Sequence, residues 1–527
     1  MLTNLLAAGT TVHPAVTTIF ALLLVGLIAC LAFEEKLHAK KSVIAGIFAI
    51  VSLLLGAALD ILPFQKTVVG SHLLEKHSSV VGEYDEEDHF VHVEIPATDA
   101  HDVQSAADAE TPDPYAESHA EHPLHVDGHE VGMPVYIPAI EWGVIAIILG
   151  SSLFVDVTSK TGLFTWIAIR VTKASRGDPL ILLVSYSVMT VVFSAVLNNV
   201  TAMIIVGSLT VVSLEKLDRR QQLLGFLLVE AFLTNVGGLL TLISSVPNII
   251  VGTTAGISFV EFFVKASPYV LLSTALTIWL GARLFKIGRL ATEQERANAA
   301  ALVDSFDEND GIESWGFFYF GAAMLGLFIV TIALTSHLPY IRDLEMGFVA
   351  MMFAGVMLLR YKSEVDQFYR RIDWDLLGFF VFLFVVIYTM EHALVLQTIG
   401  NGLQWVLRDI TAETANPLDA TIVLIGSAVF SSVTDNIPLA AMLANILKSL
   451  GTPSSSGLWW SVIFGANLGG NLTPIGSAST LVAVTLMHKH KVPMSFVGFV
   501  KMAIPYAAMQ ITLAVIYVLV VFVLLGL

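Results

Sequence analysis

The chain has one cysteine and few charged residues. Cys30 has no second thiol to pair with, which excludes an internal disulfide and a multi-thiolate metal site. Only 13% of the 527 residues are charged and 55% are hydrophobic, whereas a soluble domain carries about 25% charged residues. The sequence also has no GxxxxGK[ST] run and no HExxH run, so an ATP-driven pump and a zinc hydrolase of the usual kinds are not expected. These deficits indicate a protein whose solvent is the lipid bilayer.

Long apolar runs recur along the chain at lengths that suit membrane spans of about 17 to 25 residues. The run at 16–33 follows no basic region and precedes no cleavage site, so it is expected to be a retained span, with no targeting peptide. The clearest other runs are 43–64, 317–335, 348–359, 376–390 and 499–525. No cofactor and no nucleic-acid partner is expected.

The acidity of the chain is concentrated in one segment, residues 65–133. Between Glu75 and Glu130 there are sixteen acidic residues against the single Lys76, which accounts for most of the net charge of −17. Such a composition cannot bury enough apolar surface to fold robustly, so the sequence predicts a mostly disordered extracytoplasmic loop. Its histidines are spaced irregularly, and a solvated spacer is expected in preference to a metal site; they include His119, His122, His125 and His129.

The placement of lysine and arginine predicts the topology, because basic loops stay on the cytoplasmic side. The apolar stretch 178–217 has basic clusters at both ends, Lys173 and Arg176 at its start and Lys216, Arg219 and Arg220 at its end. Both ends are therefore expected inside, and the stretch enters the membrane and returns as a re-entrant hairpin. The remaining spans place the N-terminus and the acidic loop outside and the linker 286–314 inside, in a multi-pass plasma (inner) membrane protein.

Two segments of the chain repeat. Residues 193–201 (FSAVLNNVT) match 430–438 (FSSVTDNIP), and 234–245 (TNVGGLLTLISS) match 466–477 (ANLGGNLTPIGS). The second hairpin, 418–447, has few flanking basic residues and is expected to enter from outside, which makes the repeats inverted. The sequence thus predicts an all-α polytopic membrane protein with two inverted repeats, each with a re-entrant hairpin and a broken transmembrane helix. The predicted parts are two N-terminal helices (1–64), the acidic loop (65–133), repeat 1 (134–285), the cytoplasmic linker (286–314), two connecting helices (315–372) and repeat 2 (373–527).

Asn, Gly, Ser and Thr interrupt the repeated segments at positions where hydrocarbon would surround them. Polar breaks of this kind are tolerated only where they line an enclosed cavity, although small residues can also serve as packing contacts between helices. Amides and hydroxyls both donate and accept hydrogen bonds, so these residues leave the sign of a substrate open. The candidate substrate-binding residues are Asn198, Asn199, Thr201, Thr234, Asn235, Gly237, Gly238, Thr241, Ser244, Ser245, Asn248, Thr434, Asn436, Asn467, Gly469, Gly470, Asn471, Thr473, Ser477 and Ser479.

Two acidic residues are candidates for proton or cation coupling. Asp435 lies at the apex of the second hairpin, where its repeat counterpart Asn198 cannot titrate. A buried acid favours its protonated form and a bound cation favours the ionised form, which is the competition that an exchanger needs. Glu230, one turn before Asn235, is the second candidate. The alternatives are a salt bridge or hairpin cap for Asp435 and an interhelical hydrogen bond for Glu230.

At these motifs the chain resembles the ion transporter superfamily, in its branch of arsenite permeases, NhaD-type sodium/proton antiporters and the melanosomal P protein, which share a citrate-transporter-like domain. The resemblance rests on residues 194–201, 234–252, 431–441 and 467–479. It implies an elevator-like scaffold, often a homodimer, with two opposed hairpins and two broken helices around the site. It also implies Asn199, Asn235, Asn436 and Asn467 as binding positions and Asp435 as the acid.

The chain departs from the family pattern at two positions. Asn198 stands where relatives often have Asp, and the segment from Ser245 to Asn248 stands where they have Asp-Pro-Pro-Asn. The leading hypothesis is a sodium/proton antiporter in which Na⁺ and H⁺ compete for Asp435. The alternative is a permease or symporter for an anion or metalloid such as arsenite, silicate or a dicarboxylate. Neither a resident metal nor an enzymatic activity is expected.

Overall fold

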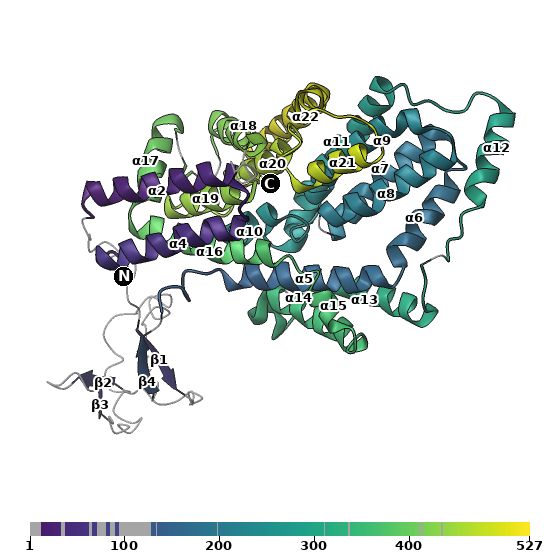
Figure 1. Cartoon of the computed structure of the whole chain (residues 1–527). Helices are drawn as coiled ribbons and strands as arrows, with labels where there is room; N and C mark the ends of the chain where they lie inside the picture. The colour runs from purple at the N-terminus through teal and green to yellow at the C-terminus, as the bar shows by residue number, and fades with distance from the viewer. Residues whose placement is uncertain are drawn as a thin grey trace, which may run out of the picture. The chain divides into compact units, whose positions relative to one another are not determined.

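The computed structural model describes residues 12–32, 37–62, 66–70, 81–84, 90–93, 128–132, 134–197, 199–309, 311–335, 338–408, 410–412, 415–433 and 436–526. The chain divides into two compact units (Figure 1). One consists of Leu62–Ala139, and the other of Met1–Ile61 together with Ile140–Leu527. The first unit is the acidic segment, and the second contains all the helices.

The described part of the acidic segment forms two short antiparallel strand pairs. Strand β1 (Lys66–Gly70) pairs with β4 (Gly128–Gly132), and β2 (Val81–Tyr84) pairs with β3 (Phe90–Val93). The sequence does not predict these strands, because the valines that favour them are few among the acidic residues. The remaining residues of the predicted disordered loop lie outside the described part.

The helical unit is that of a polytopic membrane protein, as predicted. Nine helices of the described ranges are long and apolar enough to cross a bilayer. They are α2 (Pro14–Ala32), α4 (Lys41–Ala58), α5 (Trp142–Lys160), α7 (Pro179–Val196), α8 (Asn199–Lys216), α11 (Phe259–Leu284), α13 (Trp315–Leu334), α16 (Trp374–His392) and α22 (Phe496–Val518), which continues as a π-helical turn, η3 (Leu519–Leu524).

Helices α7 and α8 form the first predicted hairpin. Asp178 begins it: its carboxylate accepts hydrogen bonds from the backbone N–H groups of Leu180 and Ile181, ahead of Pro179 at the first helical position. The two arms run antiparallel, since the Tyr186 hydroxyl lies 2.7 Å from Ser213 Oγ across the hairpin. The second hairpin consists of α18 (Pro417–Val433) and α19 (Asn436–Ser449), which pack against each other.

Each hairpin packs on a broken helix, again as predicted. The first broken helix consists of α9 (Leu223–Gly238) and α10 (Val246–Ala255), and the second of α20 (Gly457–Gly469) and α21 (Ala478–Lys489). Glycines allow close contact: a Cβ on Gly237 would lie 2.8 Å from the Val191 backbone in α7, and one on Gly469 would lie 2.2 Å from the Ala428 carbonyl in α18. The close approach of hairpin and broken helix therefore depends on these glycines.

The long helices α11 and α22 pack across the two halves. Tyr506 of α22 contacts Phe232 of the first broken helix, with ring centroids 4.8 Å apart, and Tyr269 of α11 contacts Phe464 of the second at 4.7 Å. Each contact is the counterpart of the other in the repeat, so the halves are related by an approximate twofold axis. This exchange of partners holds the two broken helices together.

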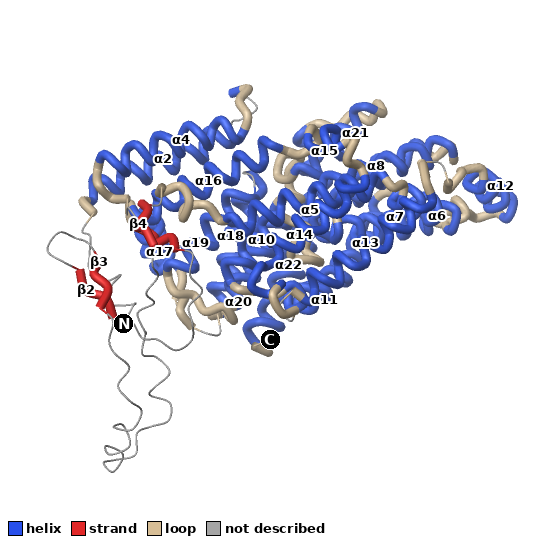
Figure 2. Tube along the Cα trace, turned by 90° about the horizontal axis from the view of Figure 1, so that it is seen from below, coloured by secondary structure: helices blue, strands red, loops and turns tan. Residues whose placement is uncertain are grey.

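The other helices surround these elements (Figures 1 and 2). Helices α2, α4 and α16 lie side by side, and α5 packs along α14. Helix α12 lies beside α6 and far from α2 in both views. The bounds of the remaining elements are α6 (Leu163–Ala174), η2 (Arg220–Gln222), α12 (Glu293–Asp304), α14 (Ile341–Arg360), α15 (Val365–Tyr369) and α17 (Val395–Val406).

Candidate functional site

The two halves place equivalent hydroxyl groups at the junction of hairpin and broken helix. Ser194 Oγ donates to the Thr234 carbonyl at 2.6 Å in the first half, and its counterpart Ser431 Oγ donates to the Ala466 carbonyl at 2.5 Å in the second. The threonines repeat the pattern. Thr241 Oγ1 donates to the Ala195 carbonyl at 2.5 Å, and Thr473 Oγ1 to the Ser432 carbonyl at 2.6 Å.

The breaks in the two halves also bind each other directly. Ser245 Oγ, from the first half, donates to Asn467 Oδ1 of the second at 2.7 Å, and Asn235 Nδ2 of the first donates to Ser477 Oγ of the second at 2.9 Å. In the repeat Ser245 corresponds to Ser477 and Asn235 to Asn467, so each contact is the equivalent of the other. The repeated motifs therefore meet in one site on the pseudo-twofold axis, as an inverted-repeat carrier requires.

Backbone carbonyls determine which way the buried amides face, because a carbonyl can only accept a hydrogen bond. Asn248 Nδ2 donates to the carbonyls of Gly238 at 2.7 Å and Thr241 at 3.0 Å, so its oxygen must face Asn467. Asn467 Nδ2 donates to that oxygen and to the Ile463 carbonyl, both at 2.8 Å. The oxygen of Asn467 is thereby directed to Ser245.

A second chain of amides is oriented in the same way. Asn471 Nδ2 donates to the Phe232 carbonyl at 3.2 Å and to Gln510 Oε1 at 2.8 Å, which directs Asn471 Oδ1 to Asn235. Asn235 Nδ2 donates to that oxygen at 2.8 Å. The oxygen of Asn235 accepts from Asn199 Nδ2 and from Ser479 Oγ, both at 3.2 Å.

Most hydrogen-bond donors of the site therefore already bond to oxygens of the protein itself. Both amide hydrogens of Asn235, Asn248, Asn467 and Asn471 are donated to protein oxygens. The oxygens of Asn467 and Asn471 each accept one hydrogen bond from the described residues and keep a lone pair. Asn199, beside the undescribed residue 198, keeps one amide hydrogen. Within the described ranges no three His, Cys, Asp or Glu side chains gather as a metal cluster.

The predicted residues differ in what they contribute. The Thr234 and Ser244 hydroxyls each donate to a backbone carbonyl of their own segment. Gly238 leaves space for Asn199, and Gly470 leaves space for Gly476. Thr201 lies in the first turn of α8, and Asn436 in the first turn of α19. Asn198, Thr434 and Asp435 lie outside the described residues.

Gln510 and Thr277 belong to the network but are not among the predicted residues. Gln510 is fully buried in α22, and its Nε2 donates to Thr277 Oγ1 of α11 at 3.0 Å. The only signal in the sequence is an amide in the middle of an apolar span. Because neither residue lies in a repeated motif, the repeat does not reveal them.

Glu230 lies fully buried in α9, one turn before the Thr234-Asn235 motif. Its Oε1 accepts a hydrogen bond from Thr210 Oγ1 of α8 at 2.5 Å, and its Oε2 has no partner among the described residues. An isolated carboxylate at such a position would be costly, so its protonation state matters to whatever the site does.

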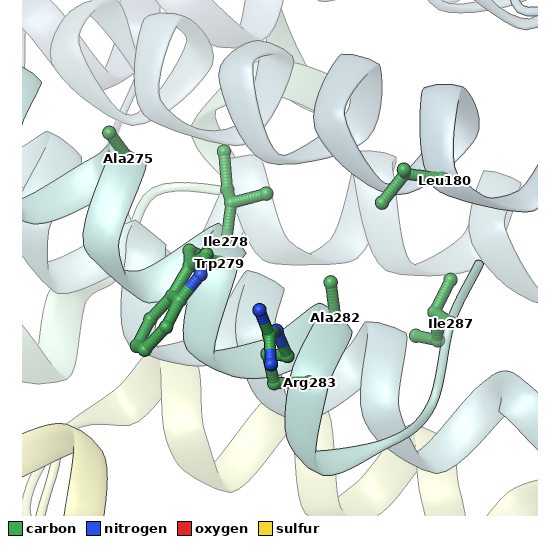
Figure 3. Close-up of a pocket in the computed structure, with 7 residues that line it drawn as sticks. All are labelled: Leu180, Ala275, Ile278, Trp279, Ala282, Arg283 and Ile287. Carbon is green, nitrogen blue, oxygen red and sulfur yellow. The ribbon is translucent and has the colours of Figure 1, made fainter. Parts of the chain in front are cut away.

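A shallow cavity lies away from this network. It has a volume of about 390 Å³ and is formed by the start of α7 and the end of α11 (Figure 3). Its lining is apolar apart from Arg283, and it includes none of the network residues. The cavity is therefore not the predicted site.

Sequence comparison places the chain among known transporters. The family model described as citrate transporter matches residues 124–465. The chain belongs to this transporter family. It is 32% identical over 385 residues to an uncharacterized transporter of Mycobacterium tuberculosis, covering 72% of this chain and 86% of that protein. It is also 25% identical to the human P protein, covering 76% of this chain and 56% of that longer protein.

The fold of this family member also resembles a solved structure. The YdaH transporter of Alcanivorax borkumensis aligns over 92% of this chain and 99% of its own, with a TM-score of 0.50 and 12% sequence identity. At that identity the likeness concerns the fold alone. It agrees with the predicted polytopic helical fold.

Proposed function

We propose that this transporter exchanges sodium ions for protons at the site between the two broken helices. The orientation of the buried amides carries the proposal. Because Asn235, Asn248, Asn467 and Asn471 donate all their amide hydrogens to protein oxygens, the site offers mainly oxygen lone pairs. Hard cations are bound by such oxygens, together with carbonyls of unwound helix segments.

The proton would compete with the cation at an acid near these oxygens. Asp435 remains the leading candidate because it is adjacent to Asn436 at the tip of the second hairpin. Glu230 is the second acid of the proposal. Neutralising either acid with a proton when the cation leaves would avoid an unpaired buried charge during the transport cycle.

The direct test is Asp435→Asn in everted vesicles loaded with a pH indicator. We expect the substitution to abolish Na⁺-driven proton movement, because an amide can bind Na⁺ but cannot exchange it for a proton. Asp366→Asn, on the surface helix α15, is the control and should keep the wild-type rate. Undiminished exchange in Asp435→Asn would reject the assignment of this acid.

A second candidate function is transport of an anion, and one observation favours it. Helix α10 begins without a side-chain cap: the Ser245 hydroxyl donates to Asn467 and accepts no hydrogen bond from the first turn of the helix. A free helix N-terminus can hold an anion such as a carboxylate or arsenite. Uptake of labelled citrate or arsenite into proteoliposomes without Na⁺ would support this candidate, and no uptake would remove it.

The topology and assembly predicted from the sequence complete the proposal. We infer a multi-pass plasma-membrane location with the N-terminus and residues 65–133 outside and the linker 286–314 inside, in a homodimer. A cysteine introduced at Ser305 in a Cys30→Ser background should react with a permeant maleimide only. Labelling by an impermeant maleimide in intact cells would reverse this orientation.

A further inference from the structure

Three buried hydroxyl groups form a hydrogen-bonded chain inside the first half. The Tyr186 hydroxyl of α7 lies 2.7 Å from Thr172 Oγ1 of α6 and 2.7 Å from Ser213 Oγ of α8. All three side chains are fully buried. Thr172 is next to Lys173 at the basic end of α6, which the topology places on the cytoplasmic side.

The chain of hydroxyls leads toward Glu230. Thr210, which donates to Glu230 Oε1, lies one helical turn before Ser213 on the same face of α8. Tyr186 is also close enough to Glu230 for the two groups to interact electrostatically. The free Oε2 of Glu230 has no partner among the described residues, although the side chain is fully buried.

The second half has no counterpart of this polar chain. Alignment of the repeated motifs places Val462 at the position of Glu230, Val423 at that of Tyr186 and Leu447 at that of Thr210. All three are buried hydrophobic residues. Both halves contribute to the amide site, whereas the hydroxyls of Tyr186 and Thr210 and the carboxyl of Glu230 occur only in the first half. The second half packs in the same fold without these polar groups, so the fold itself does not require them.

We propose that Thr172, Tyr186, Ser213 and Thr210 form a proton relay between the cytoplasmic end of α6 and Glu230. Each hydroxyl accepts a proton from one neighbour and passes its own proton to the next, so that one O–H bond forms at Glu230 as another breaks at the entrance. Ser213 and Thr210 lie one turn apart on α8, so the relay requires a further proton carrier, such as a water molecule, at this step. This relay rests on the proposed proton exchange and adds the path by which the proton reaches Glu230 from the cytoplasmic side.

The surroundings of Glu230 suit a group that receives its proton through hydroxyls. Tyr186 of α7 is the titratable group that interacts with it, and the other helices packed against α9 bring no charged side chain of the described residues to it. No lysine or arginine in the described part holds the carboxyl as a permanent ion pair. The group is therefore free to gain and lose a proton.

Infrared spectroscopy of the full-length protein in lipid tests the relay without any transported ion. The carbonyl stretch of a protonated carboxylic acid shifts when H₂O is replaced by D₂O, and Glu230→Gln identifies the band of this group. We expect Tyr186→Phe to slow the isotope exchange of that band about a hundredfold or more, the scale of positioned proton transfer. Tyr506→Phe, which removes a buried hydroxyl without a partner in the described residues, should leave the rate unchanged.

The outcomes separate the relay from the transport proposal. A band that Glu230→Gln does not remove, or equal exchange rates in Tyr186→Phe and Tyr506→Phe, would overturn the relay. Ser213→Ala provides a second break if Tyr186→Phe does not fold, and backbone amide exchange reports folding in each variant. Exchange that depends on Tyr186 in a protein without Na⁺-driven flux would keep the relay and reject the antiport.

Discussion

At the scale of single residues, Asn248 anchors the amide orientation on which the cation proposal depends. Its two amide hydrogens satisfy the carbonyls of Gly238 and Thr241 in the break between α9 and α10, and its oxygen orients Asn467. The side chain is fully buried, so no solvent can replace these bonds. Asn248 thus joins the geometry of one half to the amide of the other.

Asn248→Ala should destabilise the protein and weaken cation binding together. Ser244 Oγ lies within hydrogen-bond distance of both carbonyls but can donate to only one at a time, so the substitution leaves one buried carbonyl unpaired, at a cost of about 1–3 kcal/mol. The freed Asn467 amide can also turn a hydrogen toward the cation. We expect a lower melting temperature and an apparent KM for Na⁺ raised about tenfold or more, equivalent to about 1.4 kcal/mol. Asn445→Ala removes one bond to the Ala441 carbonyl in α19 and should leave the KM unchanged. An unaltered KM in Asn248→Ala would remove this residue from the site.

The sequence predicts most of the interacting residues at this scale but not their orientation. Asn235, Asn467 and Asn471 lie in the repeated motifs, and the structure brings all three together. The direction of each amide depends on backbone carbonyls such as that of Phe232, which no pattern of side chains records. Gln510 was missed for a related reason, since its partners come from distant helices.

At the scale of elements, each hairpin is positioned by its close packing on a broken helix. Gly469→Ala would place a methyl group 2.2 Å from the Ala428 carbonyl, whereas a Cβ on Gly426 of the same hairpin meets nothing within 4 Å. Overpacking costs about 1–3 kcal/mol or more where backbone must move. We expect Gly469→Ala to lower the melting temperature and the exchange rate and Gly426→Ala to do neither. Equal stability of the two variants would show that the hairpin can shift freely.

The linker after α12 is fastened to α6 and to the end of α8 in the first hairpin. Glu308 bonds to Lys173 and lies 3.3 Å from Arg170 Nη1, while Lys216 Nζ lies 3.9 Å from the centroid of the Phe306 ring. The hydrogen bond from Lys173 lowers the pKa of Glu308 below its usual value. A lowered pKa means that this contact stabilises the fold above the usual pKa and is lost as pH falls through the folded value.

Glu308→Gln should loosen the linker at neutral pH. The neutral amide cannot form the ion pairs, so we expect faster hydrogen exchange of the backbone around residues 305–309 than in wild type. The difference should vanish in acid, where the wild-type carboxylate is protonated as well. Asp307→Asn removes an acid that forms no salt bridge with the described residues and keeps an Oδ1 that can accept from the Asn309 N–H, so it should exchange like wild type. Equal exchange in Glu308→Gln and wild type at neutral pH would contradict the role of the contact.

The sequence predicted those elements that are flanked by basic residues or interrupted by a repeated Gly-Gly pair. Basic residues on both sides of 178–217 and the Gly-Gly pairs at 237–238 and 469–470 locate the hairpin and the breaks. The strand pairs were not predicted: β1 and β4 join segments far apart in the sequence, and β2 and β3 are short strands with few valines in an acidic sequence. The contact between the linker and the hairpin depends on single side chains and leaves no periodic pattern.

At the scale of the whole molecule, a shared scaffold supports unequal chemistry in its halves. Equivalent hydroxyls and reciprocal amides create one site on the pseudo-twofold axis. The departures from symmetry are polar: Asn471 stands where the first half has Leu239, and Glu230 where the second has Val462. An inverted repeat allows the site to face either side in turn, and in the proposed relay the unequal residues give the proton a route through the first half.

The sign of the transported ion tests the account most directly. Purified protein on a solid-supported membrane can be exposed to jumps of Na⁺ or Li⁺, and separately to citrate or arsenite at constant Na⁺, while the pH of the lumen is followed. A site of oriented amide and hydroxyl oxygens predicts charge displacement on the cation jumps, coupled to proton movement and shifted to higher Na⁺ concentration in Asn248→Ala. Displacement on the anion jumps alone, with no response to Na⁺ or Li⁺, would contradict it.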